Sequence, residues 1–181
     1  MTQYYAPITE HQERVEKFMK LAGQELPDRP TLPNEEVRLL RAKLILEEAL
    51  ETIEALGMSV CVTYKDGLTF GPTIEKHNIC FIPNKTANLE EIIDGCCDIS
   101  VVTIGTLSAC GVPDQPFLEE VDENNLAKFG PGGYRREDGK WVKPPDHTPP
   151  KIKEVLKAIN DLNRTMDQID NKEPFSETVQ M

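Results

Sequence analysis

The chain has 181 residues, a formal net charge of −11 and a hydrophobic fraction of 39%. This length and composition predict one globular domain with irregular ends and a substantial core. The negative charge argues against a partner that is nucleic acid or a membrane surface, since both require a basic face. The five cysteines show no zinc-site spacing and the amino terminus shows no leader sequence, so we expect a cytoplasmic protein with reduced thiols.

Periodicity and helix-breaking residues divide the chain into predicted elements. Helices are expected over residues 11–22, 39–56, 88–110, 117–129 and 152–169, with Asn34 and Asn88 as amino-terminal caps. An alternating pattern with turn residues indicates a small hairpin or irregular insert at 58–86, and an Asp-Gly turn indicates another hairpin within the basic loop at 130–150. The predicted class is all-α, a helical bundle with one or two small β-hairpins. The predicted organisation is an arm at 1–12, a domain at 13–165 and a tail at 166–181.

The helix at 39–56 combines an apolar surface with many acids. Glu47, Glu48, Glu51 and Glu54 fall within about a third of its circumference. A helix that is apolar on nearly every side belongs in an interior, where unpaired charges are prohibitive, and a divalent cation would neutralise them. A solvated acidic face is the alternative for this helix taken alone, and Glu54 is interpreted as a rim residue.

A second group of acids lies on the predicted helix at 88–110. Glu91 and Asp94 are three residues apart on one face, and Glu48 and Glu51 have the same spacing on the first helix. Two antiparallel helices that each offer such a pair can surround an octahedral ion with oxygen ligands, which indicates Mg²⁺, with Mn²⁺ as a substitute. No histidine accompanies either pair, and this argues against zinc or a di-iron site.

The apolar run at 95–111 is interpreted as a buried helix, because it is short for a membrane span and carries Asp98 with several Ser and Thr residues. The adjacent Cys96 and Cys97 are expected to pack in the core. Asp98 is either a further ligand or, as we favour, a partner of Arg41 or Lys43 that orients the site from outside the ligand shell.

The order and spacing of these acids resemble a known signature. Residues 47–51 (Glu-Glu-Ala-Leu-Glu) and 91–94 (Glu-Ile-Ile-Asp) match the EExxE…ExxD motif of the all-α nucleoside triphosphate pyrophosphohydrolases. This superfamily contains the MazG-like enzymes, the dimeric dUTPases and the phosphoribosyl-ATP pyrophosphohydrolases. Segments at 39–41, 94–99, 105–106, 125–128 and 138–143 are similar to the MazG-like subgroup, and the resemblance covers approximately residues 13–158. Two features depart from the pattern, namely the long insert between the two acid pairs and the proline at position 144.

The resemblance implies an enzyme that hydrolyses a (deoxy)nucleoside triphosphate to the monophosphate and pyrophosphate, in nucleotide-pool control or house-cleaning. By resemblance, Glu48, Glu51, Glu91 and Asp94 are the magnesium ligands. Glu47 is then the catalytic residue that holds or deprotonates the attacking water, or it binds a further ion. Such a reaction suits Mg²⁺, which neutralises phosphates and lowers the pKa of a bound water.

A basic segment offers counter-charge for a phosphate chain. Residues 128–143 hold five basic side chains against two acids. The positions that match the family and are predicted to contact the substrate are Asn125, Lys128, Lys140 and Lys143. Arg135 and Arg136 are further candidates on charge alone, with an exposed turn as the equal alternative.

Two other functions remain open from the sequence. One is a non-catalytic helical oligomer that binds a metal or a nucleotide, and the other is the same fold acting on phosphoribosyl-ATP or a nucleoside diphosphate. The two most apolar helices need more cover than the other helices offer, so we expect a homodimer or homotetramer.

Overall fold

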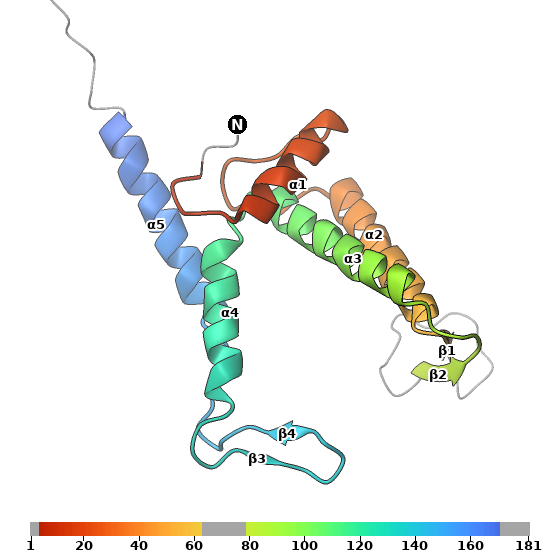
Figure 1. The fold of residues 1–181 in the computed structure, drawn as a ribbon. Helices are drawn as coiled ribbons and strands as arrows, with labels where there is room; N and C mark the ends of the chain where they lie inside the picture. Colours follow the sequence, from red (N-terminus) through yellow and green to blue (C-terminus); the bar gives the residue numbers. More distant parts are fainter. Residues whose placement is uncertain (1–3, 63–78, 171–181) are drawn as a thin grey trace, which may run out of the picture. The chain divides into compact units, whose positions relative to one another are not determined.

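The computed structural model describes residues 4–62 and 79–170, which form mainly helices with two short antiparallel strand pairs (Figure 1). The helices are α1 (Glu10–Leu21), α2 (Glu35–Ala55), α3 (Leu89–Ala109), α4 (Gln115–Ala127) and α5 (Ile152–Asp170). Strand β1 (Met58–Val62) pairs with β2 (Ile79–Pro83), and β3 (Tyr134–Arg135) pairs with β4 (Trp141–Val142). The predicted all-α class with small hairpins is confirmed. The middle of the predicted insert and the end of the predicted tail lie outside the described residues.

The chain divides into two compact units, one of residues 1–32 with 107–181 and one of residues 33–106. A buried polar network holds the first unit together. The Gln12 amide nitrogen donates to Ser108 Oγ and to the Val112 carbonyl, both at 3.0 Å, and its amide oxygen accepts from the Asp114 N–H at 2.6 Å. The buried Asp114 carboxylate accepts from Thr9, the residue that caps α1. Every step joins segments about 100 residues apart, so the network ties α1 to the α3–α4 connection.

Helix α4 starts two residues earlier than predicted. Asp114 occupies its N-cap position and Pro116 lies in its first turn, where the missing N–H of proline has no helical partner to lose. Further on, Asn124 Nδ2 donates to the Thr148 carbonyl at 2.8 Å, and Glu120 accepts the Lys151 N–H at 2.7 Å. These bonds attach the approach to α5 along the side of α4.

The second unit is a helical hairpin with a strand pair at its turn. Asn34 Oδ1 accepts the Val37 N–H at 2.9 Å and begins α2, as the sequence predicts. Gly57, with a φ of +78°, ends that helix in a conformation that favours glycine and leads into β1. Asn88 Oδ1 accepts the Glu90 N–H at 3.1 Å at the start of α3. Helix α3 then runs back beside α2 (Figure 1).

The apolar surface of α2 and α3 is only partly covered. Val102 and Ile104 of α3 are buried, whereas Leu46 on α2 and Ile93 on α3 are exposed. Cys96 and Cys97 are also exposed, so the prediction that they pack in the core is wrong for the single chain, because nothing in the described residues covers that side of α3. By length and composition alone α3 also fits a membrane span, which is weak evidence because core helices pass the same test.

Candidate active site

Helices α2 and α3 lie in tight contact where Gly95 faces Thr52. A Cβ atom on Gly95 would lie 2.4 Å from Thr52 Oγ1 and 3.2 Å from Thr52 Cα. Thr52 is buried, and its hydroxyl donates to the Glu48 carbonyl at 2.7 Å, which fixes its orientation. Only a residue without a side chain fits opposite it. This contact brings the acidic faces of the two helices together.

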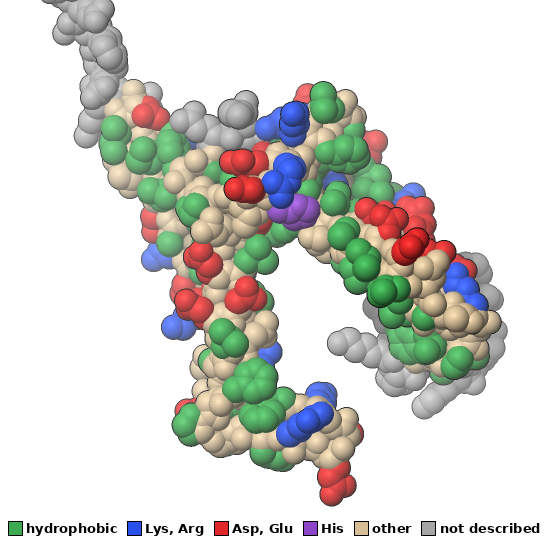
Figure 2. All heavy atoms as spheres, viewed as in Figure 1, with side chains coloured by type: hydrophobic (Ala, Val, Ile, Leu, Met, Phe, Trp, Pro, Cys, Tyr) green, Lys and Arg blue, Asp and Glu red, His purple; other side chains and the backbone are tan. Residues whose placement is uncertain are grey.

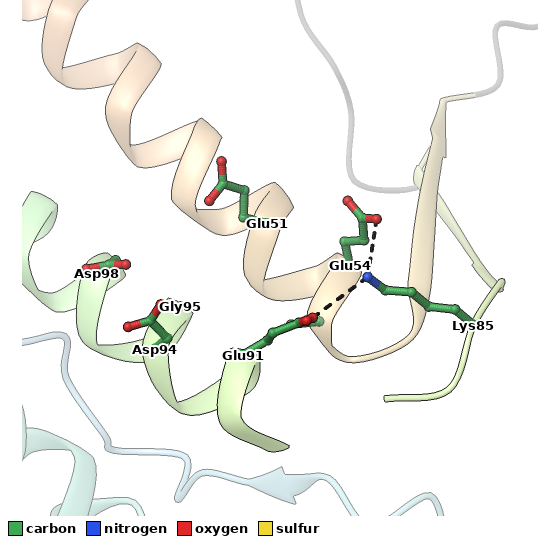
Figure 3. Close-up of a pocket in the computed structure, with 8 residues that line it drawn as sticks. Glu51, Glu54, Lys85, Glu91, Asp94, Gly95 and Asp98 are labelled. Atoms are coloured by element: carbon green, nitrogen blue, oxygen red, sulfur yellow. Dashed lines mark hydrogen bonds and ion pairs between the residues drawn. The ribbon is translucent and has the colours of Figure 1, made fainter. Parts of the chain in front are cut away.

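The acids of both helices line one open cleft of about 270 Å³. Figure 3 shows Glu51 and Glu54 on α2 opposite Glu91, Asp94 and Asp98 on α3. In the space-filling view, acidic side chains gather over these helices next to hydrophobic ones (Figure 2). Ala55, Gly95 and Lys85 complete the lining. Of the two acid pairs predicted from the sequence, Glu51 of the first pair and both Glu91 and Asp94 of the second therefore line one cleft.

Glu48 does not line the cleft, but its charge is coupled to the acids that do. Loss of surrounding water raises the pKa of Glu48, and the negative charges of Asp98, Glu51, Glu47 and Asp94 raise it further. These carboxylates therefore repel one another. Glu47 is exposed on α2 and also lies outside the cleft lining.

The donor set suits a hard divalent cation in its chemistry. The described lining offers carboxylate oxygens and neither imidazole nor thiolate, which favours Mg²⁺ or Mn²⁺ over zinc. Among the described residues, no three His, Cys, Asp or Glu side chains lie close enough together to hold an ion as they stand. Binding of an ion would require the carboxylate side chains to rotate inward.

A lysine that the sequence analysis did not single out lies among these acids. Lys85 Nζ is 3.3 Å from Glu54 Oε1 and 3.9 Å from Glu91 Oε2 (Figure 3). Its only sequence signal is its position six residues before Glu91. Its place in the cleft depends on the hairpin that turns the chain back onto α2, and helical periodicity does not predict that hairpin.

The predicted substrate contacts belong to the first unit. Lys128 Nζ donates to Asn125 Oδ1 at 2.6 Å at the end of α4, so these two residues lie together. Lys140 and Lys143 are exposed on either side of β4. Trp141 attaches this hairpin to α4, because its indole N–H donates to the Lys128 carbonyl and its ring packs on Phe129 with centroids 4.8 Å apart.

The two arginines named on charge alone have partners within the same hairpin. Arg136 forms an ion pair of 2.8 Å with Asp138, and Arg135 donates to the Gly139 carbonyl at 3.4 Å. Both arginines therefore make contacts within the turn of their own hairpin.

Comparison with known families bears on this arrangement directly. The model of the family described as phosphoribosyl-ATP pyrophosphohydrolase matches residues 15–125. The chain belongs to this family. A search of curated proteins gave no match. The phosphoribosyl-ATP pyrophosphohydrolase family is part of the MazG-like superfamily, so the resemblance inferred from the two acidic motifs is confirmed.

Family membership indicates a hydrolase that cleaves a pyrophosphate linkage. Both acidic motifs and every residue of the cleft lie inside the matched range. The basic hairpin at 128–143 lies beyond its end.

Proposed function

We propose that this chain is a Mg²⁺-dependent nucleotide pyrophosphohydrolase that converts (deoxy)nucleoside triphosphates into the monophosphate and pyrophosphate. The observation that carries the proposal is the acid-lined cleft between α2 and α3 in a member of a pyrophosphohydrolase family. Triphosphates reach an acidic protein as complexes with divalent cations, and a cleft of carboxylates recruits such cations.

In this proposal, Glu48, Glu51, Glu91 and Asp94 hold the ion from two helices. When bound, Mg²⁺ (or Mn²⁺) neutralises the phosphates and lowers the pKa of a bound water. Glu47 holds that water or accepts its proton from an exposed position on α2. The buried Thr52–Gly95 contact sets the spacing of the two walls, so the helices themselves need not move.

The remaining substrate contacts are proposed to come from the basic segment. Lys128, Lys140 and Lys143 supply positive charge for phosphates, and Asn125 contacts the nucleotide. Trp141 fixes the hairpin to the end of α4, so these side chains are presented from an anchored element.

Phosphoribosyl-ATP is the second candidate substrate, because the matching family is named for it. Both candidates contain a triphosphate whose cleavage releases pyrophosphate, so the same acids serve either. Phosphoribosyl-ATP carries one more phosphate than an ordinary nucleoside triphosphate, so the two candidates are distinguished by comparing them directly in the assay.

The test is a pyrophosphate-release assay across canonical and modified triphosphates and phosphoribosyl-ATP, with and without Mg²⁺. Glu48→Gln and Asp94→Asn are each expected to lower kcat/KM by at least about 100-fold. Glu90→Gln is the matched control, since Glu90 is exposed on α3 and outside the cleft. Full activity in both Glu48→Gln and Asp94→Asn would refute the site, and orthophosphate as the product would refute the reaction.

A further inference from the structure

The acid cleft contains a cation of the chain itself. Among the described residues, Lys85 is the one basic side chain that lines it. Its ammonium group bridges the two walls, 3.3 Å from Glu54 of α2 and 3.9 Å from Glu91 of α3 (Figure 3). Glu91 is one of the residues proposed to hold the divalent ion, so the lysine and the ion have a ligand in common.

The backbone around Lys85 is fastened to the end of α2, so its position is not that of a loosely attached surface chain. The Asn84 N–H donates to the Gly57 carbonyl at 2.9 Å, and the Asn88 N–H donates to the Ala55 carbonyl at 3.0 Å. The Lys85 carbonyl oxygen packs against Gly57, since a Cβ atom on Gly57 would lie only 2.5 Å from it. The segment therefore delivers the lysine side chain to the cleft mouth.

The two ion pairs are of the kind that a stronger cation can displace. The side chains of Lys85, Glu54 and Glu91 are 41%, 64% and 55% exposed. Ion pairs this exposed to water contribute little to stability. A divalent ion carries twice the charge and binds several carboxylates at once, so it competes successfully for the same oxygen atoms.

We propose that Lys85 is a built-in counter-ion of the acid cleft, which engages Glu91 in the absence of a divalent cation and releases it when one binds. This inference rests on the proposed metal site. In this role the positive charge of Lys85 offsets the repulsion between carboxylates on the two walls of the cleft. Lys85 is then a positioning residue that lowers the affinity of the site for the free ion.

The test is Mn²⁺ binding to the full-length protein without nucleotide, followed by electron paramagnetic resonance of the free ion. Lys85→Gln is expected to bind Mn²⁺ about three- to tenfold more tightly than the wild type, because a competing charge is lost. Lys153→Gln changes the net charge equally from an exposed position on α5 and is expected to leave the affinity unchanged. Lys85→Arg keeps the charge and should remain within about twofold of the wild type.

A second measurement follows the lysine itself. Acetylation by an N-hydroxysuccinimide ester, read by mass spectrometry, is expected to rise at Lys85 when Mg²⁺ is added and to stay constant at the exposed Lys153. Equal Mn²⁺ affinity in Lys85→Gln and wild type, or unchanged labelling of Lys85, would overturn the counter-ion role while leaving a metal-binding, active enzyme intact. Absence of Mn²⁺ binding in every variant would overturn both this inference and the proposed metal site.

Discussion

Replacing Gly95 by alanine tests whether the spacing of α2 and α3 sets the acid site. The new Cβ would lie 2.4 Å from Thr52 Oγ1, about 1 Å short of the 3.4 Å at which ordinary contact begins. Turning the Thr52 side chain away would break its bond to the Glu48 carbonyl and would still leave Thr52 Cα only 3.2 Å from the new atom. The helices must therefore move apart.

Two opposing terms decide the change in stability. Overpacking a fitted contact costs about 1–3 kcal/mol, and the misfit here belongs to the upper part of that range since backbone is involved. Alanine in place of glycine within a helix returns about 1 kcal/mol. We expect the variant to be less stable by about 1–2 kcal/mol. Displacement of one wall by about 1 Å is expected to lower kcat/KM by about 100-fold, because the acids proposed to hold the ion would then lie farther apart.

Urea unfolding gives the stability, and pyrophosphate release and Mn²⁺ titration give the effect on the site. Thr52→Ala removes the Oγ1 atom that the new methyl group meets. The double variant Gly95→Ala/Thr52→Ala should therefore recover most of the lost stability and part of the activity. Gly95→Ala as stable and as active as the wild type would refute the reasoning, as would a double variant no better than the single one.

Three further outcomes are expected. Burial and the 2.8 Å hydrogen bond to Glu16 raise the pKa of Tyr4, so the bond stabilises the fold below about pH 10 and this contribution is lost at higher pH. Tyr4→Phe should therefore reduce the loss of stability at alkaline pH in urea unfolding. The same pH dependence of stability in Tyr4→Phe and wild type would contradict this. Glu48→Gln removes the repulsion between Glu48 and the neighbouring carboxylates, so it should stabilise the metal-free protein by about 0.5 kcal/mol. The same variant should reduce the stabilisation that Mg²⁺ gives in thermal melts. A lower melting temperature than the wild type without metal would contradict this. If exposed α2 residues mediate self-association, Leu46→Glu should lower the mass measured by light scattering, and an unchanged mass would exclude Leu46 from the interface.

The helices and the two acidic motifs could be predicted because they depend on local spacing. Periodicity places Glu48 with Glu51 and Glu91 with Asp94, and the Asn34 cap signals where α2 begins. The position of Lys85 could not be predicted, since it depends on how a hairpin folds back onto α2. The exposure of Cys96 was also missed, because an apolar helix indicates that cover is needed but not where the cover comes from.

The strand pair at the turn of the second unit closes the backbone between α2 and α3. Met58 faces Pro83 and Val62 faces Ile79, so the backbone is closed by a ladder before residues 63–78 begin. Length or composition can change beyond that ladder without altering the distance between α2 and α3. The long insert that departs from the subgroup pattern thus joins the second unit at a point where sequence can be added, removed or exchanged without changing the spacing of α2 and α3.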